Sequence, residues 1–367
     1  MSDKQKQTIG RYEMLRSVGK GAQGAVYLGR DPALDRLVAI KIMTCADPDL
    51  VSMTDDGVPL EGRIAGKLKH PNIIPIYDAG ECDVGPFLVF EYVEGNTLAD
   101  NLKANGPQTI EKAVPMMAAI LQAVATAHDA EILHLDLNPR NVLIDENDVP
   151  KVMDFGLSQF FSKTREPSQF ATGTLRYMAP EHFLGKPIGP YTDVFALGST
   201  FYELVTGHKA MAGTTLDEIR SRIIASAVDY EPLKADAHGE AFARFLAGAL
   251  EARQEGRYAD CAVMKEAFEL FLTEAGLEDQ AQVAVTNHST VDFLLRRMQR
   301  TGDFPTISRT LSDINRLTGD DPGANADKLA NVILRDFALT SKLLKLVNSS
   351  FYGARATEIT NISDAVV

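Results

Sequence analysis

The chain of 367 residues is long enough for two or three domains, and its 45% hydrophobic content supplies the apolar side chains for their cores. Its formal net charge of −13 and the lack of a dense basic run argue against a protein that binds nucleic acid through phosphate contacts. The three cysteines, Cys45, Cys82 and Cys261, are scattered and form no CxxC pair, so we expect a reduced, cytoplasmic environment.

Residues 1–10 are predicted to form a solvated tail, because they are polar and lack the apolar core of a signal sequence. No apolar run is long enough to span a bilayer, so we expect either a soluble protein or a membrane region that lies outside this chain. Apolar and polar side chains then alternate from residue 11 to residue 18, as in a β-strand. Three glycines follow, at Gly19, Gly21 and Gly24.

A dinucleotide-binding turn would need a helix directly after the third glycine. Residues 25–28 (Ala-Val-Tyr-Leu) instead predict a second strand, so the segment is predicted to be a glycine-rich β-hairpin. Glycines allow the backbone N–H groups of such a turn to approach phosphate oxygens.

A third strand is predicted at residues 38–41 and carries one charged side chain, Lys41. One explanation of this lysine is that it lies at the edge of the sheet, where its amine reaches water. A helix is predicted around Glu61, because apolar residues recur at helical spacing at Leu60, Ile64 and Leu68. Gly62 and Gly66 are poor helix formers and weaken this helix, so we expect it to be mobile.

Further strands are predicted at residues 73–76 and 87–90. Residues 111–129 predict a buried helix, with apolar side chains at Val114, Met117, Leu121 and Val124. This helix ends in His128-Asp129, which we interpret as helix-end packing and solvent contact rather than as a metal-binding pair.

The central stretch of the chain is residues 134–156, HLDLNPRNVLIDENDVPKVMDFG. It places Asp136 and Asn141 in one loop and Asp154 farther along the chain. Between them a strand, a polar turn and a second strand are predicted at residues 142–144, 145–150 and 151–153. A hairpin of this length can return Asp154 close to the other two side chains. Phosphoryl transfer from a nucleotide needs such a set, because one carboxylate orients the attacking hydroxyl while a second carboxylate and an amide oxygen hold magnesium.

This stretch resembles the catalytic loop and the DFG segment of the eukaryotic-type protein kinases. The glycine-rich hairpin, the lysine strand and the Ala-Pro-Glu sequence at 179–181 resemble further elements of that family, in the family's order. The resemblance implies an α+β fold of two lobes in residues 11–273. The small β-rich lobe would span about 11–94 and the larger helical lobe about 95–273.

The resemblance also implies roles for the site residues. Asp136 would orient the substrate hydroxyl, and Asn141 and Asp154 would bind Mg²⁺. Lys41, held by Glu61, would bind the α- and β-phosphates of ATP. The expected ATP-binding residues of the glycine turn are Gly19, Lys20, Gly21, Ala22, Gln23 and Gly24. Around the adenine we expect Val26, Ala39, Leu143 and the backbone near Glu91 and Val93, with Phe90 behind them.

Residues 157–172 are predicted to form a mobile activation segment, and residues 173–181 resemble the substrate-docking turn of the family. Small-molecule kinases with a related core generally lack this segment, so a protein substrate is favoured, and Gly173-Thr174 favours Ser/Thr specificity. Two structural roles are also implied. Asp193 would accept backbone N–H bonds from the catalytic loop, and Glu181 would pair with Arg257.

Two positions depart from the HRDLKPxN pattern that is usual in the family. Leu135 replaces the arginine that normally pairs with a phosphorylated activation segment. Asn138 replaces the lysine that neutralises the transferring phosphate, and the loss of such a contact costs about a few kcal/mol of barrier. We expect Arg140, four residues after Asp136, to supply that charge, although a surface role would also explain it. Phosphorylation is expected to matter less than usual at Thr164, Ser168 and Thr172.

Residues 274–290 are predicted to form a linker. Residues 291–367 resemble the first part of an HDOD domain, a helical module of bacterial signalling proteins, most specifically in LLKLVNSSFYG at 343–353. This segment contains no His or Cys, so we expect no metal site and a partner- or signal-binding role. A helical bundle that only caps the kinase is the alternative. The chain stops within an apolar pattern, so we expect the module to be truncated.

The sequence thus predicts an ATP- and magnesium-dependent protein serine/threonine kinase linked to a regulatory module. The alternative is a pseudokinase that acts as a nucleotide-binding or scaffold switch, and it rests on Asn138 and Leu135. A small-molecule kinase is a weaker third interpretation.

Overall fold

The computed structural model describes residues 8–21, 24–43, 66, 68–155 and 172–280. The chain divides into two units, residues 1–284 and 285–367, and the described residues all lie in the first unit. The predicted second module therefore lies outside the described residues.

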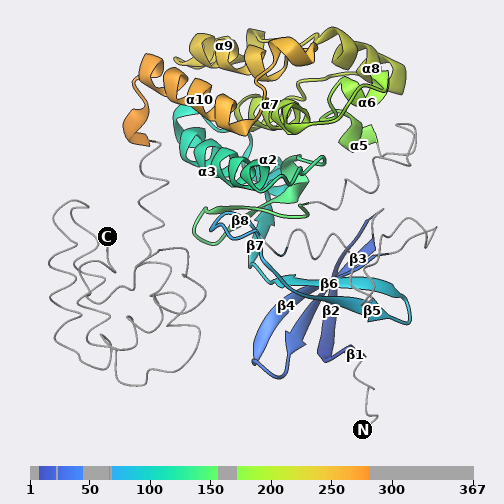
Figure 1. The fold of residues 1–367 in the computed structure, drawn as a ribbon. Helices are drawn as coiled ribbons and strands as arrows, with labels where there is room; N and C mark the ends of the chain where they lie inside the picture. Colours follow the sequence, from blue (N-terminus) through green and yellow to red (C-terminus); the bar gives the residue numbers. More distant parts are fainter. Residues whose placement is uncertain (1–7, 22–23, 44–65, 67, 156–171, 281–367) are drawn as a thin grey trace, which may run out of the picture. The chain divides into compact units, whose positions relative to one another are not determined.

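The first lobe is a six-stranded antiparallel sheet in the order β1-β2-β3-β4-β6-β5 (Figure 1). Alternation along β4 sends Val38, Ile40 and Ile42 into one apolar cluster, while Phe90 of β6 packs in a cluster on the other face. The strands are β1 (Thr8–Ile9), β2 (Tyr12–Gly21), β3 (Gly24–Asp31), β4 (Arg36–Met43), β5 (Ile76–Cys82) and β6 (Gly85–Glu91).

The predicted strand at 73–76 is wrong. Strand β5 begins only at Ile76 and continues to Cys82, and Ile73 makes an isolated parallel bridge to Val152. The cause is Pro75, which has no N–H to donate to a ladder. Its carbonyl accepts the N–H of Glu91 at 3.1 Å, which anchors the segment beside the sheet.

A second, three-stranded sheet carries the predicted hairpin. Its turn is built around Asp145, whose Oδ1 accepts the N–H groups of Asn147 at 2.8 Å and Val149 at 3.0 Å. The strands are β7 (Gly95–Thr97), β8 (Val142–Asp145) and β9 (Pro150–Val152). The hairpin returns the chain to Asp154, as the sequence predicts.

The second lobe is helical, and α7 lies in its middle (Figure 1). Helix α7 starts at Pro190, three residues before Asp193, and Gly189 precedes it. The helices are α2 (Leu98–Asn105), α3 (Ile110–Asp129), α5 (Thr172–Leu175), α6 (Glu181–Leu184), α7 (Pro190–Thr206), α8 (Leu216–Ala225), α9 (Gly239–Ala249) and α10 (Cys261–Ala275). Short 3₁₀ turns are η2 (Pro139–Asn141), η4 (Glu231–Ala235) and η5 (Gln254–Gly256).

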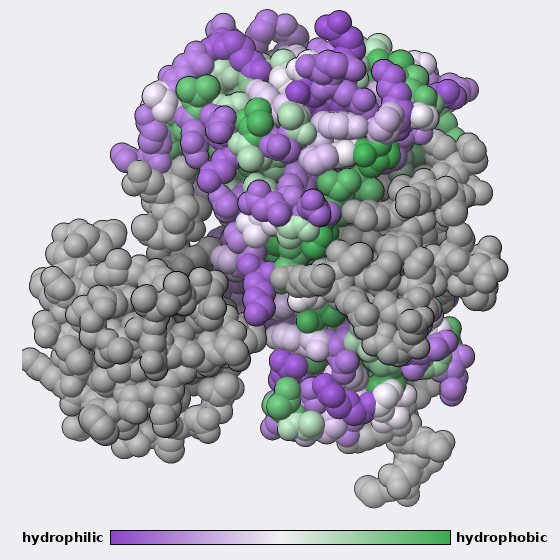
Figure 2. Space-filling view, viewed as in Figure 1, coloured by the Kyte–Doolittle hydropathy of each residue, from purple (hydrophilic) through white to green (hydrophobic). Residues whose placement is uncertain are grey.

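Helix α3 confirms the predicted buried helix, because Val114, Met117, Leu121 and Val124 are all fully buried. Among the described residues it alone has the length and mean hydropathy, 1.3, of a membrane-spanning helix. Most of it is packed inside the lobe, so this is weak evidence for a span. Hydrophilic side chains cover most of the visible surface of the helical lobe (Figure 2).

Candidate active site

Asp136 is held by two asparagine amides at the centre of the loop between α3 and β8. Nδ2 of Asn141 donates to Oδ2 of Asp136 at 3.0 Å, and Nδ2 of Asn138 donates to Oδ1 at 3.2 Å. Both amides also donate to the main-chain carbonyl of Asp136, at 2.7 and 2.8 Å. The carboxylate is therefore fixed by donors on each oxygen.

Asp154 approaches this loop from the end of the β8–β9 hairpin. The N–H of Met153 donates to the carbonyl of Asn141 at 3.0 Å, which ties the hairpin to the loop. Asp154 has a positive φ of 65°, and its Oδ2 lies 2.9 Å from Nζ of Lys41 on β4. The structure thus brings Lys41, Asp136, Asn141 and Asp154 together across the two lobes.

His134 connects the same two segments through its two ring nitrogens. Its Nε2 lies 2.9 Å from the carbonyl oxygen of Met153, and its Nδ1 accepts the N–H of Asp136 at 3.3 Å. The ring is completely buried and lies 4.7 Å from the ring of Phe155.

Burial raises the pKa of Asp136, while the nearby His134 and the hydrogen bond from Asn141 act in the opposite direction. Asp136 is therefore a stronger base than an exposed aspartate, which suits a group that accepts a hydroxyl proton.

Asp193, at the start of α7, holds the backbone of the loop. Its carboxylate accepts the N–H groups of His134 at 2.8 Å and Leu135 at 2.7 Å, which confirms the predicted contact. Leu135 has a positive φ of 61°, a conformation that leucine rarely adopts without support from its surroundings. Burial favours the neutral form of Asp193, but the hydrogen bonds from His128 and from the backbone of His134 outweigh it and lower the pKa.

His128 is the residue that sequence reasoning missed. Its Nε2 donates to Oδ2 of Asp193 at 2.9 Å, and its Nδ1 accepts the N–H of Cys261 at 3.4 Å. The side chain is 6% exposed, so the expected solvent contact is wrong for this residue. The described residues hold no cluster of three potential metal ligands, and the interpretation against a metal pair stays a prediction. No local pattern signals the role, because Asp193 lies 65 residues away.

We expect His128→Ala to destabilise the fold by about 1–3 kcal/mol, because it leaves a buried Asp193 oxygen with one donor fewer. The urea unfolding midpoint measures this effect. His208→Ala, which removes an exposed imidazole from the same lobe, serves as the control. Equal midpoints for the two variants would contradict the role assigned to His128.

The glycine turn is confirmed as a hairpin, with Gly21 opposite Gly24 in the β2–β3 register. At Gly24, φ is 142° and an added Cβ would lie 2.0 Å from the carbonyl oxygen of Ile42. Close approach of β4 therefore demands this glycine, whereas an added Cβ at Gly19 would meet no atom within 4 Å. Lys20 is exposed on β2, and Ala22 and Gln23 lie outside the described residues.

Several predicted adenine-contacting residues share one apolar cluster. Ala39, Val93 and Leu143 are partly buried and pack against the cluster that contains Phe90. Val26 lies opposite Lys41 in the β3–β4 register and is partly exposed. The N–H of Glu91 is already bonded to Pro75, so the donor to an adenine would have to come from Val93 rather than Glu91.

Three predicted residues, Glu61, Thr164 and Ser168, lie outside the described residues. The tether between Lys41 and Glu61 therefore stays a prediction.

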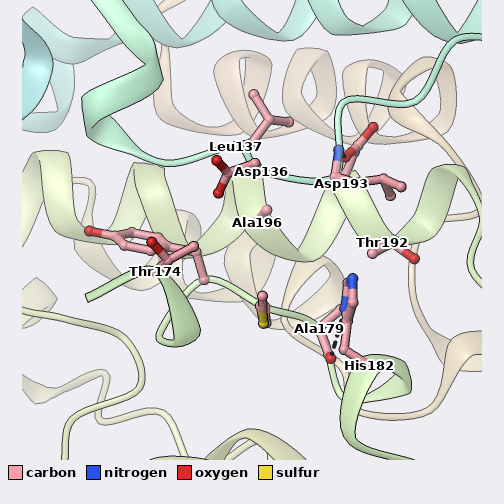
Figure 3. Close-up of a pocket in the computed structure, with 11 residues that line it drawn as sticks. Asp136, Leu137, Thr174, Ala179, His182, Thr192, Asp193 and Ala196 are labelled. Atoms are coloured by element: carbon pink, nitrogen blue, oxygen red, sulfur yellow. Dashed lines mark hydrogen bonds between the residues drawn. The ribbon is translucent and has the colours of Figure 1, made fainter. Parts of the chain in front are cut away.

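The segment that the sequence predicts to dock the substrate contains α5, α6 and the loop between them. A pocket there is lined by Leu135, Asp136, Thr174, Tyr177 and His182, among others. In Figure 3 Asp136 and Thr174 stand on one side of this pocket and His182 on the other.

Tyr177, one of the residues that line this pocket, is held by two side chains. It donates from its hydroxyl to Glu203, and it accepts from Nζ of Lys209 at 2.7 Å. Burial and the charge of Glu203 raise its pKa, so the hydroxyl stays protonated and serves as a structural donor.

The predicted ion pair between Glu181 and Arg257 is confirmed. Two guanidinium nitrogens of Arg257 donate to the two carboxylate oxygens of Glu181, at 2.9 and 3.2 Å. Both side chains are almost fully buried, and Thr192 adds a third donor to the carboxylate at 2.8 Å.

Comparison with known proteins places this site in a family. The family model "Protein kinase domain" matches residues 12–269, and the model "HDOD domain" matches residues 304–367. The chain is 39% identical over 206 residues to serine/threonine-protein kinase PrkC of Bacillus subtilis, a match that covers 55% of the chain and 31% of that protein. It is 32% identical over 270 residues to serine/threonine-protein kinase PknB of Mycobacterium tuberculosis, with 70% of the chain and 42% of that protein covered.

The chain therefore spans less than half the length of these curated relatives. Among solved structures, it is similar to Rad53 1–466 in complex with AMP-PNP, with a TM-score of 0.60 and 26% identity over 70% of the chain and 64% of that structure. Because the kinase model alone matches residues 12–269 of 367, the chain belongs to the protein kinase family.

Proposed function

We propose that this chain is a serine/threonine protein kinase that uses ATP and Mg²⁺. The observation that carries the proposal is the convergence of Lys41, Asp136, Asn141 and Asp154. The names of the curated relatives, which are serine/threonine kinases, support the same activity.

The residues present fit a magnesium ion. Asn141 holds Asp136 through its Nδ2. The Oδ1 of Asn141 has no hydrogen-bond partner among the described residues. Asp154 uses Oδ2 for Lys41 and keeps Oδ1 without a partner in that same part of the chain. These two oxygens are the hard ligands that Mg²⁺ prefers, and the ion would neutralise charge on the phosphates when bound.

In the proposed reaction, Asp136 accepts the proton of a Ser or Thr hydroxyl as the hydroxyl oxygen bonds to the γ-phosphorus. The bond between the γ-phosphorus and the bridging oxygen breaks, and ADP leaves with that electron pair. Lys41 holds the α- and β-phosphates. Thr174, which lines the pocket with Asp136, would support the choice of a small hydroxyl substrate.

Arg140 is the proposed source of the positive charge that Asn138 cannot give. Arg140 is exposed, and its positive charge acts to lower the pKa of Tyr177, whereas burial raises that pKa. Its charge therefore acts on a residue that lines the same pocket as Asp136. We expect Arg140→Ala to lower kcat by about 10–100-fold, because one phosphate contact is lost at the transition state. Steady-state kinetics at saturating ATP measure this, with exposed Arg253→Ala as the control; full activity of Arg140→Ala would overturn the assignment.

A pseudokinase remains the competing proposal, and the lysine missing at Asn138 is the observation that favours it. Two assays separate the alternatives: thermal stabilisation by ATP with and without Mg²⁺, and phosphate transfer to a generic Ser/Thr substrate. Magnesium-dependent stabilisation together with transfer supports the kinase, whereas stabilisation without transfer supports the switch. We further propose a cytoplasmic protein whose HDOD-like segment binds a signalling partner.

A further inference from the structure

The side chain of Asn138 uses both of its amide hydrogens and its carbonyl oxygen within the catalytic loop. Its Nδ2 donates to Oδ1 of Asp136 at 3.2 Å and to the carbonyl of Asp136 at 2.8 Å. Its Oδ1 accepts the N–H of Arg140 at 3.0 Å, which caps the 3₁₀ turn η2. The residue is 5% exposed, so water does not replace these partners.

This arrangement fixes the orientation of the amide. If oxygen and nitrogen were exchanged, the carbonyl would face the carboxylate of Asp136, and the amide nitrogen would face the N–H of Arg140. Both contacts would be repulsive. With its donors and acceptor so engaged, Asn138 has no donor left for a phosphate, and it acts on other residues of the loop.

We propose that Asn138 is a positioning residue for the proposed phosphoryl transfer, on which this inference rests: it holds the catalytic carboxylate of Asp136 and presents Arg140. Asn141 alone would leave Oδ1 of Asp136 without a donor from this loop, and the carboxylate could rotate about its terminal bond. With both amides, each oxygen has a fixed direction. The acceptor of Asn138 also fixes the first turn of η2, from which Arg140 extends. Asn138, which stands where the family usually has a lysine, thus orders the side chains of Asp136 and Arg140.

Three variants test the inference. Asn138→Asp keeps the shape and the cap on Arg140 but places a carboxylate against Asp136. Asn138→Ala removes both the donor and the cap. Asn147→Ala removes an exposed amide from the β8–β9 turn and serves as the control. We expect kcat to fall about 10–100-fold for both Asn138 variants. The KM for ATP should change less than about twofold, because both amide hydrogens of Asn138 are engaged by Asp136 and are not free for the nucleotide.

A second measurement does not depend on activity. The urea midpoint shift caused by Asn138→Ala is measured in the wild-type chain and in an Asp136→Ala background. We expect a smaller shift in the second background, because the carboxylate of Asp136, one of the two acceptors of the amide, is gone. Equal shifts, or an active Asn138→Asp variant with wild-type kcat, would overturn the positioning role. An inactive wild-type chain with unequal shifts would instead refute the proposed kinase activity and leave the contact established.

Discussion

Asp136→Asn should lower kcat by about 1,000-fold while the chain stays folded and still binds ATP. The change keeps the shape of the side chain but removes the base that accepts the hydroxyl proton, and loss of such a group costs about 10²–10⁴ in rate. The amides of Asn138 and Asn141 can still bond one oxygen, so we expect the loop to survive. Steady-state phosphate transfer and thermal stabilisation by ATP measure the two effects.

The matched control is Asp148→Asn. Asp148 lies in the turn of the β8–β9 hairpin with φ of 59°, a conformation that asparagine adopts readily. It should keep wild-type activity. If Asp136→Asn kept more than about a tenth of the wild-type rate, Asp136 would not be the base of the reaction.

Arg257→Ala is expected to destabilise the chain by about 3–5 kcal/mol. The substitution leaves the carboxylate of Glu181 buried, with the hydroxyl of Thr192 as a remaining donor. An uncompensated charge in this position costs far more than the pair itself contributes. The guanidinium also donates to the carbonyl groups of Glu251 and Tyr191, so its loss frees the loop before α10 as well.

Arg253→Ala is the comparison variant, because Arg253 lies four residues before Arg257 in the same loop. Arg253 is 80% exposed and lies 3.6 Å from Glu251, a surface pair worth about 0–1 kcal/mol. Chemical unfolding of both variants should therefore separate them clearly. Similar unfolding free energies would mean that the pair between Glu181 and Arg257 is not a determinant of stability.

Much of the site follows from sequence because its residues are close together in the chain. Asp136, Asn141 and Asp154 lie on one loop and one hairpin, and the hairpin turn is signalled by polar residues. The pairing of Glu181 with Arg257 and the contact of Asp193 with the loop follow from the family pattern, and both are present.

The errors and omissions have physical causes. The segment at 73–76 is apolar enough for a strand, but Pro75 prevents pairing, and the strand runs instead through Ala79 and Gly80. His128 gives no local sign of its role because its partner lies on another helix. For Asn138 the sequence reveals a lost charge, whereas the bonds that the amide makes instead depend on how the backbone folds around Asp136.

The measurement that tests the central claim most directly is mass-spectrometric mapping of phosphate after the purified chain is incubated with ATP and Mg²⁺, beside an Asp136→Ala control. We predict phosphate on Ser or Thr residues of the wild-type chain or of an added protein substrate, and none with the control. Binding of ATP with Mg²⁺ but no phosphate in either sample would contradict the kinase assignment and favour a nucleotide-binding switch.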